Sequence, residues 1–429
     1  MIGAIADDLT GATDVAAAFG SAGLRVGLFF GGIDPSASTV EFDVIVVGLK
    51  TRTVPADEAV ARSVAVAQAL AARGCAQVYV KYCSTFDSSP AGNIGPVADA
   101  LAAELHAGSV VFAPTTPAQG RTVYQGHLFV GDVLLSESSM RDHPLTPMTD
   151  ASLPRVLRAQ TTHEVGLVAH DAVRAGSVSS RIARLHAQGA DFVIVDALDD
   201  ADLDEVARAV RGDRLVTGAA GLAAAIARDT ARSTGARAGD ADDTAERLAA
   251  AGTAAALAGS CSARTREQIA RWQQLSPALR LDPVTTPDSE QLAAHALAWY
   301  ERVQGSGTPL IFSSADPAEL HRSQQTLGAG RAAELVEHAL GLIATGLVRR
   351  GVDRLIVAGG ETSGEVVRAL GVTHGRIGAE AAPGVPWIFA DRPAPIALLL
   401  KSGNYGDTDL LVRAAGVRTT HTHDSGGTP

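Results

Sequence analysis

Short apolar runs that alternate with helix-periodic segments are the feature that most constrains this fold. Each run is three to six residues long, and Ala-rich segments with helical spacing stand between several of them. Because parallel strands are joined by crossover helices, the alternation predicts an α/β fold with mainly parallel sheets. In the N-terminal half the expected strands are residues 2–6, 25–30, 44–47, 77–80, 109–113, 164–168, 192–196 and 215–218, and the expected helices include 13–22, 56–73 and 93–106.

The length of 429 residues exceeds what a single hydrophobic core usually supports, so two domains are expected. From about residue 227 to 252 the sequence is polar and repetitive without a strand pattern, which is typical of an interdomain connection. A second set of apolar runs follows at 254–258, 309–313, 354–358, 387–389 and 396–400. We expect two α/β domains over 1–228 and 253–417, a connection over 229–252, an unordered tail over 418–429, and ligands in the cleft between the domains.

Composition and charge exclude several classes of protein. Apolar residues make up 46% of the chain and charged residues 19%, which is typical of a globular protein. The formal charge is −11, from 36 basic and 47 acidic residues, and no long Lys/Arg tract occurs, so nucleic acid is not expected as a partner. The N-terminus has no basic region, and no apolar run approaches the length of about 20 residues that a membrane helix needs. With three cysteines outside any metal-binding spacing, we expect reduced thiols in a cytoplasmic protein that contacts no membrane.

The segment 355–370, LIVAGGETSGEVVRAL, contains a short apolar run that breaks at Gly359 and Gly360 and resumes as a helix pattern. Glycines let the backbone approach a ligand closely, and the amides in the first turn of a helix point outward unpaired. Glu361 and Thr362 occupy the junction, where a hydroxyl can cap the helix or donate to a phosphoryl oxygen. The motif fits a phosphate cradle, and taken alone it fits a tight turn equally well.

Two other expected strand ends carry similar residues, with Ser260 in GSCS and Gly403 in KSGNYG. Since ligands in open α/β sheets bind beyond the carboxyl ends of strands, three such ends together predict a nucleotide site. The sequence contains neither GxxxxGK[ST] nor GxGxxG, so a Walker P-loop and a dinucleotide fingerprint are not expected.

Asp7 and Asp8 follow the first apolar run, directly before a helix start marked by Thr10 and Gly11. One of the pair is expected to cap that helix. Two adjacent acids exceed what capping requires. The other carboxylate can accept hydrogen bonds from a polyhydroxy substrate, hold Mg²⁺, or take a proton from an attacking hydroxyl.

The loop 81–90, KYCSTFDSSP, combines a cation with hydroxyl side chains and an acid. It leads through Asn93 into a helix that opens with glycine. Lys81, Ser84, Asp87 and Asn93 together suit a small anionic polyol, because they offer both charge and hydrogen bonds.

Arg52 and Arg121 follow other expected strands of the same domain, and a guanidinium fork can bind both oxygens of a sugar-acid carboxylate. For each of these cations alone, a solvated surface role is the more common one. His127 and His143 lie in a polar, turn-rich stretch that is longer than a connection needs, and loops of this kind tend to be functional. We hold open both a ligand contact and a structural role for these histidines.

Six segments resemble the four-carbon acid sugar kinase family, in order from residue 2 to about residue 413. They are IADDLTGATDVAAAF, KYCSTFDSSPAGNIGP, the stretch PTTPAQGRTVYQGHLFVGDVLLSESSMRDHPLTPMTD, GSCSARTREQI, VAGGETSGEV and LLLKSGNYGDTDLL. The KYCSTFDS loop resembles the 3-oxo-tetronate 4-kinase branch more than the threonate kinases, where a loop closer to KxDSTLRG is expected. The resemblance implies an N-terminal substrate-binding domain and a C-terminal nucleotide-binding domain.

The same resemblance implies that MgATP phosphorylates the 4-hydroxyl of a 3-oxo-tetronate. It places ATP at Ser260, at Gly359, Gly360, Glu361 and Thr362, and at Gly403. We assign Asp8, or failing it Asp7, as the base, and Lys81 as a stabilising cation. Asp407 and Asp409 either assist a Mg²⁺ shell or cap the following helix, so no metal ligand is assigned. The substrate contacts are expected from Arg52, Lys81, Ser84, Asp87, Asn93 and Arg121, and the stereoisomer and a possible homo-oligomer are left open.

Two other classes fit a two-domain α/β pattern. One is an NAD-dependent sugar-acid oxidoreductase, which the missing GxGxxG and the acidic first turn oppose. The other is a non-catalytic sugar-acid binding protein, which gives no reason for a nucleotide cradle. ATP-dependent thermal stabilisation separates these readings.

Overall fold

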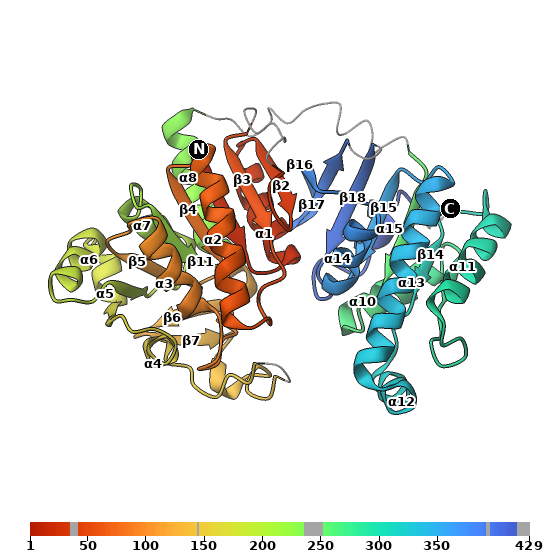
Figure 1. The fold of residues 1–429 in the computed structure, drawn as a ribbon, viewed down its shortest axis with the longest axis horizontal. Helices are drawn as coiled ribbons and strands as arrows, with labels where there is room; N and C mark the ends of the chain where they lie inside the picture. Colours follow the sequence, from red (N-terminus) through yellow and green to blue (C-terminus); the bar gives the residue numbers. More distant parts are fainter. Residues whose placement is uncertain (35–41, 144–145, 236–251, 392–394, 418–429) are drawn as a thin grey trace, which may run out of the picture. The chain divides into compact units, whose positions relative to one another are not determined.

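The structure is a computed structural model that describes residues 1–34, 42–143, 146–235, 252–391 and 395–417 (Figure 1). The expected connection falls outside these residues from 236 to 251, and the expected tail lies outside them entirely. The chain forms two compact units, Met1–Asp242 with Thr373–Ala379, and Asp243–Val372 with Glu380–Pro429. Each unit contains a mainly parallel sheet with helices, which confirms the predicted α/β class.

The first unit contains a sheet of eight parallel strands, and all eight were predicted from the apolar runs. Its order is β2–β3–β1–β4–β11–β5–β10–β9. The strands are β1 (Ile2–Ala6), β2 (Val26–Phe30), β3 (Val44–Gly48), β4 (Gln77–Lys81), β5 (Val110–Ala113), β9 (Val165–Val168), β10 (Phe192–Val195) and β11 (Leu215–Gly218).

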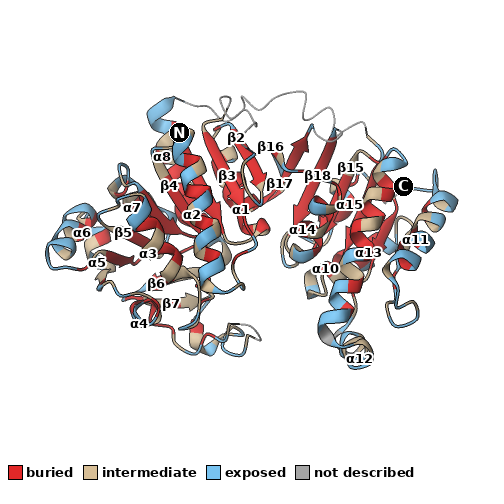
Figure 2. Cartoon of the chain, viewed as in Figure 1, coloured by how far each residue is buried: buried red, intermediate tan, exposed pale blue. Residues whose placement is uncertain are grey.

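Helices connect these strands, as crossover connections between parallel strands require. They are α1 (Leu9–Ser21), α2 (Ala56–Ala72), α3 (Ile94–Glu104), α4 (Leu153–Arg158), α5 (His170–Arg174), α6 (Val178–Ala187), α7 (Asp200–Ala209) and α8 (Ala220–Thr234). Helix α8 continues beyond residue 229, where the connection was expected to begin, because Ala227 and Ala231 remain buried on its inner face. Figure 2 shows the central strands as the most buried elements, which explains why they are apolar on both faces.

A small antiparallel sheet lies in the stretch that the sequence presented only as polar and turn-rich. Its strands are β6 (Arg121–Tyr124), β7 (His127–Val130) and β8 (Val133–Leu134), and short 3-10 turns flank it at Pro117–Gln119 and Leu135–Glu137. The buried carboxylate of Asp196 accepts hydrogen bonds from the amides of Gln125 (2.7 Å) and Gly126 (2.8 Å), which fixes the β6–β7 turn. Strands of two to four residues are too short to give a clear apolar pattern.

The second unit contains the sheet order β13–β14–β12–β15–β18–β17, parallel except for β17, which runs antiparallel to β18. Its strands are β12 (Ala254–Ala258), β13 (Ala278–Arg280), β14 (Leu310–Phe312), β15 (Arg354–Ala358), β17 (Val385–Ala390) and β18 (Ile396–Lys401). Its helices are α10 (Ala263–Gln273), α11 (Ser289–Val303), α12 (Pro317–Leu327), α13 (Ala329–Arg349), α14 (Gly360–Ala369) and α15 (Leu410–Ala414). The short strand β13 was not expected from the sequence.

Strand β16 (His374–Ala382) was also not expected. Its first residues pair antiparallel with β2, which is why Thr373–Ala379 belong to the first unit although they lie within the expected C-terminal domain. His374 stacks on Phe29 there, with ring centroids 5.3 Å apart.

None of the helices in the described ranges combines the length and the apolar character needed to cross a bilayer. Cys75, Cys83 and Cys261 are free thiols.

Candidate active site

The acid pair lies where β1 passes into α1. Asp8 is the N-cap of α1, and its Oδ1 accepts a hydrogen bond of 2.6 Å from the amide of Gly11. The Thr10 hydroxyl donates to Asp8 Oδ2 at 3.1 Å. The structure therefore assigns the predicted capping role to Asp8, and Asp7 is the carboxylate that capping does not require.

Arg52 joins the two carboxylates. Its Nε and Nη2 donate to both oxygens of Asp7 at 2.9 and 2.7 Å, and its Nη1 lies 2.9 Å from Asp8 Oδ2. All three guanidinium nitrogens are engaged in this way. That Arg52 binds the substrate carboxylate stays a prediction, since its described ion pairs are with the acid pair.

The two carboxyl groups differ in their electrostatics. Burial raises the pKa of Asp7 above its ordinary value, and the neighbouring Asp8 adds to this effect, while Arg52 opposes it. Burial acts in the same direction on Asp8, but Arg52, Lys81 and the Gly11 amide together hold its pKa below the ordinary value. The side chains are 20% and 28% exposed, so solvent or a small ligand can reach both.

Lys81 ends β4, the strand beside β1, and stands level with Ala6 in the pairing register. Its side chain is buried, and its Nζ donates to the carbonyl of Tyr82 at 2.7 Å. A Cβ at Gly11 would lie 3.3 Å from Lys81 Nζ and would collide with Asp8 Oδ1. Glycine at position 11 thus lets the ammonium stand close to the helix cap.

Asn93 holds the loop that carries Arg52. Its Nδ2 donates to the carbonyls of Thr51 (2.6 Å) and Val54 (2.9 Å). Its Oδ1 is buried and has no hydrogen-bond partner among the described residues. Asn93 and Asp87 line one cavity together with Asp7, Arg52 and Lys81. The structure thus brings five of the predicted residues together.

Ser84 and Arg121 do not line that cavity in the described part of the chain. They meet instead through Gln119, whose Oε1 accepts from the Ser84 hydroxyl at 3.4 Å and whose carbonyl accepts from Arg121 Nη1. Arg121 Nε is buried and has no partner among the described atoms. His127 and His143 contact groups of their own loops, the Gln125 carbonyl and Thr146.

In the second unit, strand register brings the three predicted loops together. Ala258 pairs with Ala358, and Ala358 pairs with Lys401, so β12, β15 and β18 end at one level. The amides of Gly259 and Ser260 both donate to the Ala358 carbonyl, at 3.0 and 3.2 Å. The loops after these strands therefore start side by side.

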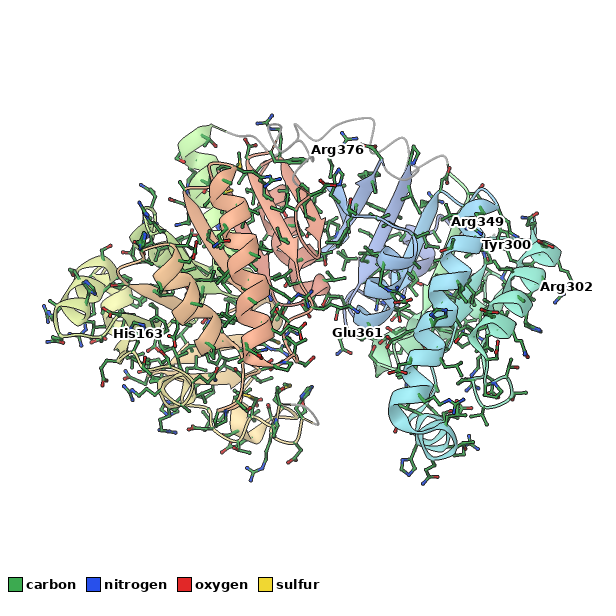
Figure 3. The ribbon with its side chains drawn as sticks, viewed as in Figure 1. His163, Tyr300, Arg302, Arg349, Glu361 and Arg376 are labelled. Carbon is green, nitrogen blue, oxygen red and sulfur yellow. The ribbon has the colours of Figure 1, made fainter. Side chains whose placement is uncertain are left out.

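Gly359 has φ +129° and ψ 134°, a conformation open essentially to glycine alone. A Cβ there would lie 3.0 Å from Thr362 Oγ1 and 3.1 Å from the Ser260 amide. Helix α14 begins at Gly360, and no side chain caps it in the described structure, which leaves the amides of its first turn open to a ligand. Glu361 is exposed at this helix start (Figure 3).

Gly403 packs against the loop of Ser260, where a Cβ would collide with Ser260 Oγ and lie 3.0 Å from Ser262 Oγ. Its carbonyl accepts from the hydroxyls of Ser262 (2.6 Å) and Thr265 (2.8 Å). Gly403 therefore packs against the loop of Ser260, which with Gly359 and Gly360 forms the expected phosphate cradle. The resemblance pointed to Gly403 itself, and the sequence offered no signal for Thr265.

A pocket of about 310 Å³ extends from this cradle. Its lining includes Gly259, Ser260 and the first turn of α14, together with an apolar wall from α12 and α13. Its size falls in the lower range of small-molecule sites. The wall was missed by sequence reasoning because its residues carry no motif; they include Leu320, Ala332 and Val336.

Within the described ranges, no group of three or more His, Cys, Asp or Glu side chains is arranged to hold a metal ion. Asp407 pairs with Arg413 at 3.0 Å, and Asp409 pairs with Arg271 at 2.8 Å. Asp409 is the N-cap residue of α15 without a side-chain cap hydrogen bond.

Comparison with known proteins agrees with this arrangement. Residues 2–226 match the model of a sugar-binding N-terminal domain, and residues 255–411 match that of a nucleotide-binding C-terminal domain. The 3-oxo-tetronate kinase of Cupriavidus necator is 47% identical over 96% of both chains. Those of Burkholderia multivorans and Salmonella typhimurium are 45% and 41% identical, over 96% of this chain and 96% and 98% of their own.

Two solved structures are similar over 96% of this chain. A protein of Salmonella typhimurium LT2, described as a putative tRNA synthase, has a TM-score of 0.87 at 40% identity over 98% of its own chain. A Haemophilus influenzae protein has a TM-score of 0.80 at 39% identity over 99% of its own chain. The identities, the two domain matches and the two solved folds agree, and the chain belongs to the four-carbon acid sugar kinase family.

Proposed function

We infer that this chain is an ATP-dependent kinase that phosphorylates the 4-hydroxyl of a four-carbon sugar acid, with 3-oxo-tetronate as its substrate. The observation that carries this inference is the 41–47% identity to proteins named 3-oxo-tetronate kinase over 96% of this chain. The glycine-lined strand ends and the charged cluster around Asp7 give it a physical basis. Neither rival class, an oxidoreductase or a binding protein, accounts for both features.

We propose that the nucleotide lies in the pocket of the second unit. Its phosphates would lie at Ser260, Gly359 and Gly360, where the absence of a side chain at Gly359 keeps the loop open and the α14 amides favour negative charge. The adenosine would lie along the apolar wall of α12 and α13. Mg²⁺ would supply charge neutralisation on the phosphates, held mainly by their own oxygens and by water.

In the first unit, Asp7 is the proposed acceptor of the 4-hydroxyl proton. Its raised pKa supports this choice over Asp8, whose carboxylate already caps α1. Arg52 orients both carboxylates, and Lys81 supplies positive charge where negative charge develops during transfer.

The remaining contacts follow from unsatisfied groups. Asn93 Oδ1 is a buried acceptor without a partner among the described residues and suits a sugar hydroxyl. The guanidinium of Arg121, whose Nε has no partner among the described atoms, suits the sugar carboxylate. Ser84 would contact the substrate near Arg121, and Asp87 would contact it along the cavity. The proposed location is the cytoplasm, where free thiols such as those of this chain persist.

The test is an ADP-release assay with the purified chain over a panel of four-carbon sugar acids and their 3-oxo forms, followed by phosphorus NMR to locate the ester. We expect ADP release with a 3-oxo-tetronate and a phosphate on C4. Absence of ADP release with every acid would refute the kinase assignment. A nicotinamide absorbance change would favour the oxidoreductase instead.

A further inference from the structure

Lys401 is a buried lysine at the start of the KSGNYG motif, and neither the sequence analysis nor the proposed chemistry gave it a role. It ends β18, is 0% exposed, and donates to Thr265 Oγ1 (3.0 Å) and to the carbonyls of Ser402 and Gly403 (both 2.9 Å). Three acceptors require three N–H donors, and only the ammonium form of lysine has three. No carboxylate pairs with it in the described part of the chain.

A buried cation without a counter-ion is costly, so its retention needs a reason. Its contacts supply one, because the Gly403 carbonyl also accepts from Ser262 and Thr265, the residues that open α10. All three donors converge on one peptide group, whose glycine packs against Ser260 at the phosphate end of the pocket.

We propose that Lys401 is a positioning residue of the nucleotide site, which in its ammonium form fixes the Gly403 loop against Ser260 and gains stability when a polyphosphate occupies the cradle. The inference rests on the proposed kinase function. Nucleotide binding should then depend on the protonation of a residue that does not touch the nucleotide.

The charges around Lys401 would make its protonation sensitive to pH and to a bound anion. Burial, followed by the field of Arg264 on α10, lowers the pKa of Lys401 to about 8. The carboxylates on the adjacent elements are engaged elsewhere, since Glu267 pairs with Arg264 and Asp407 pairs with Arg413. Glu361 lies exposed at the start of α14. A bound polyphosphate would therefore be the main anion to offset the buried ammonium.

The experiment is titration calorimetry of the full chain with MgADP, alongside steady-state kinetics. Lys401→Met is expected to raise Kd for MgADP and KM for ATP about tenfold or more, with little change in KM for the sugar acid. The ligand-free melting temperature should stay the same or rise, because an apolar side chain replaces a buried charge. Lys401→Arg should recover part of the affinity. The matched control is Lys81→Met, because Lys81 is also a buried lysine at the end of a strand but belongs to the other unit. This variant should leave Kd for MgADP unchanged.

Two further measurements keep the test decisive. The Kd of wild type for MgADP should rise as the pH rises above about 8, and the Kd of Lys401→Met should show no such pH dependence. If Lys401→Met does not fold, Thr265→Val takes its place in the test. This substitution removes the hydroxyl between Lys401 and Gly403 and should also weaken the binding of MgADP. If wild type fails to bind MgADP, the proposed function fails. If wild type binds but neither variant nor high pH weakens binding, the role of Lys401 is overturned.

Discussion

The two strand-end sites of this chain use opposite electrostatic designs. At β1 and β4 of the first unit, the guanidinium of Arg52 joins two carboxylates, and the buried ammonium of Lys81 helps to lower the pKa of Asp8. At β12, β15 and β18 of the second unit, the contacts are made by glycines, hydroxyls and backbone amides around a single buried ammonium. The chain contains only three lysines, and two of them, Lys81 and Lys401, end strands of these two sites.

The difference fits the functions proposed for the two sites. A site that takes a proton from a neutral hydroxyl needs its own charges and shifted pKa values, as Asp7 and Asp8 have. A site that binds a polyphosphate receives charge from its ligand and needs mainly donors and space. Four predictions test this contrast, in order of decreasing effect.

The largest effect is expected from Asp7→Asn, which removes the proposed proton acceptor but keeps the shape of the side chain. We expect kcat to fall about 10²- to 10⁴-fold. Kd for MgADP should not change, because the second unit binds the nucleotide. Turnover close to wild type, measured by ADP release, would remove Asp7 from the mechanism and return attention to Asp8.

The next prediction concerns the nucleotide site alone. Gly359→Ala forces a Cβ into a backbone conformation that costs about 1–3 kcal/mol and brings it to 3.0 Å from Thr362 Oγ1. KM for ATP should rise about tenfold or more, since that is the effect of losing about 1.4 kcal/mol of binding.

Gly371→Ala is the matched control for this substitution. Gly371 also has a positive φ, of +67°, but its Cβ would meet no atom within 4 Å. It should lower stability by about 1 kcal/mol without changing KM for ATP. Equal effects of both substitutions on KM would show that the cradle does not bind phosphate.

A smaller effect is expected from Asn93→Ala, which frees the loop of Arg52. The loss of the two bonds to Thr51 and Val54 should lower kcat/KM for the sugar acid about tenfold. KM for ATP should stay constant, and a parallel rise in both KM values would indicate general unfolding instead.

The smallest effect is a pH dependence of stability that belongs to the second unit. Lys401 has a pKa of about 8 in the folded chain and an ordinary value of 10.5, so the unfolded chain binds more protons between these values. The free energy of unfolding should therefore rise with pH in this window, by at most about 1.4 kcal/mol per pH unit.

Tryptophan fluorescence can isolate this contribution, because Trp272, Trp299 and Trp387 all lie in the second unit. Urea unfolding of wild type and Lys401→Met should differ by a term that shrinks from pH 7.5 to 9.5. A constant difference would show that Lys401 keeps an ordinary pKa.

Much of the fold was predictable from sequence. Apart from β13, the parallel strands of both units were recognised because each is a continuous apolar run between helix patterns. The strands β6, β7, β8, β13 and β16 were not, since short or solvent-facing strands produce no such run. The edge position of β16 beside β2 depends on a pairing between residues that are far apart in the chain.

The candidate sites divide in the same way. Gly359, Gly403 and the pair Asp7–Asp8 were predicted because missing side chains and adjacent acids at strand ends are visible locally. Arg52 was predicted to bind a substrate carboxylate, whereas its described partners are Asp7 and Asp8, a pairing that spans 45 residues. A guanidinium next to a strand end does not reveal its partner from sequence.

By itself, the sequence determined the longer apolar strands and the helices between them, the glycines at the strand ends and the residues that carry charge, because periodicity and side-chain size are local properties. Tertiary structure decided that β12, β15 and β18 end at one level, and that Ser262 bonds to a glycine 141 residues away. It also buried Lys401 beneath that glycine. Register between distant strands sets these contacts, and no single segment of the chain encodes that register.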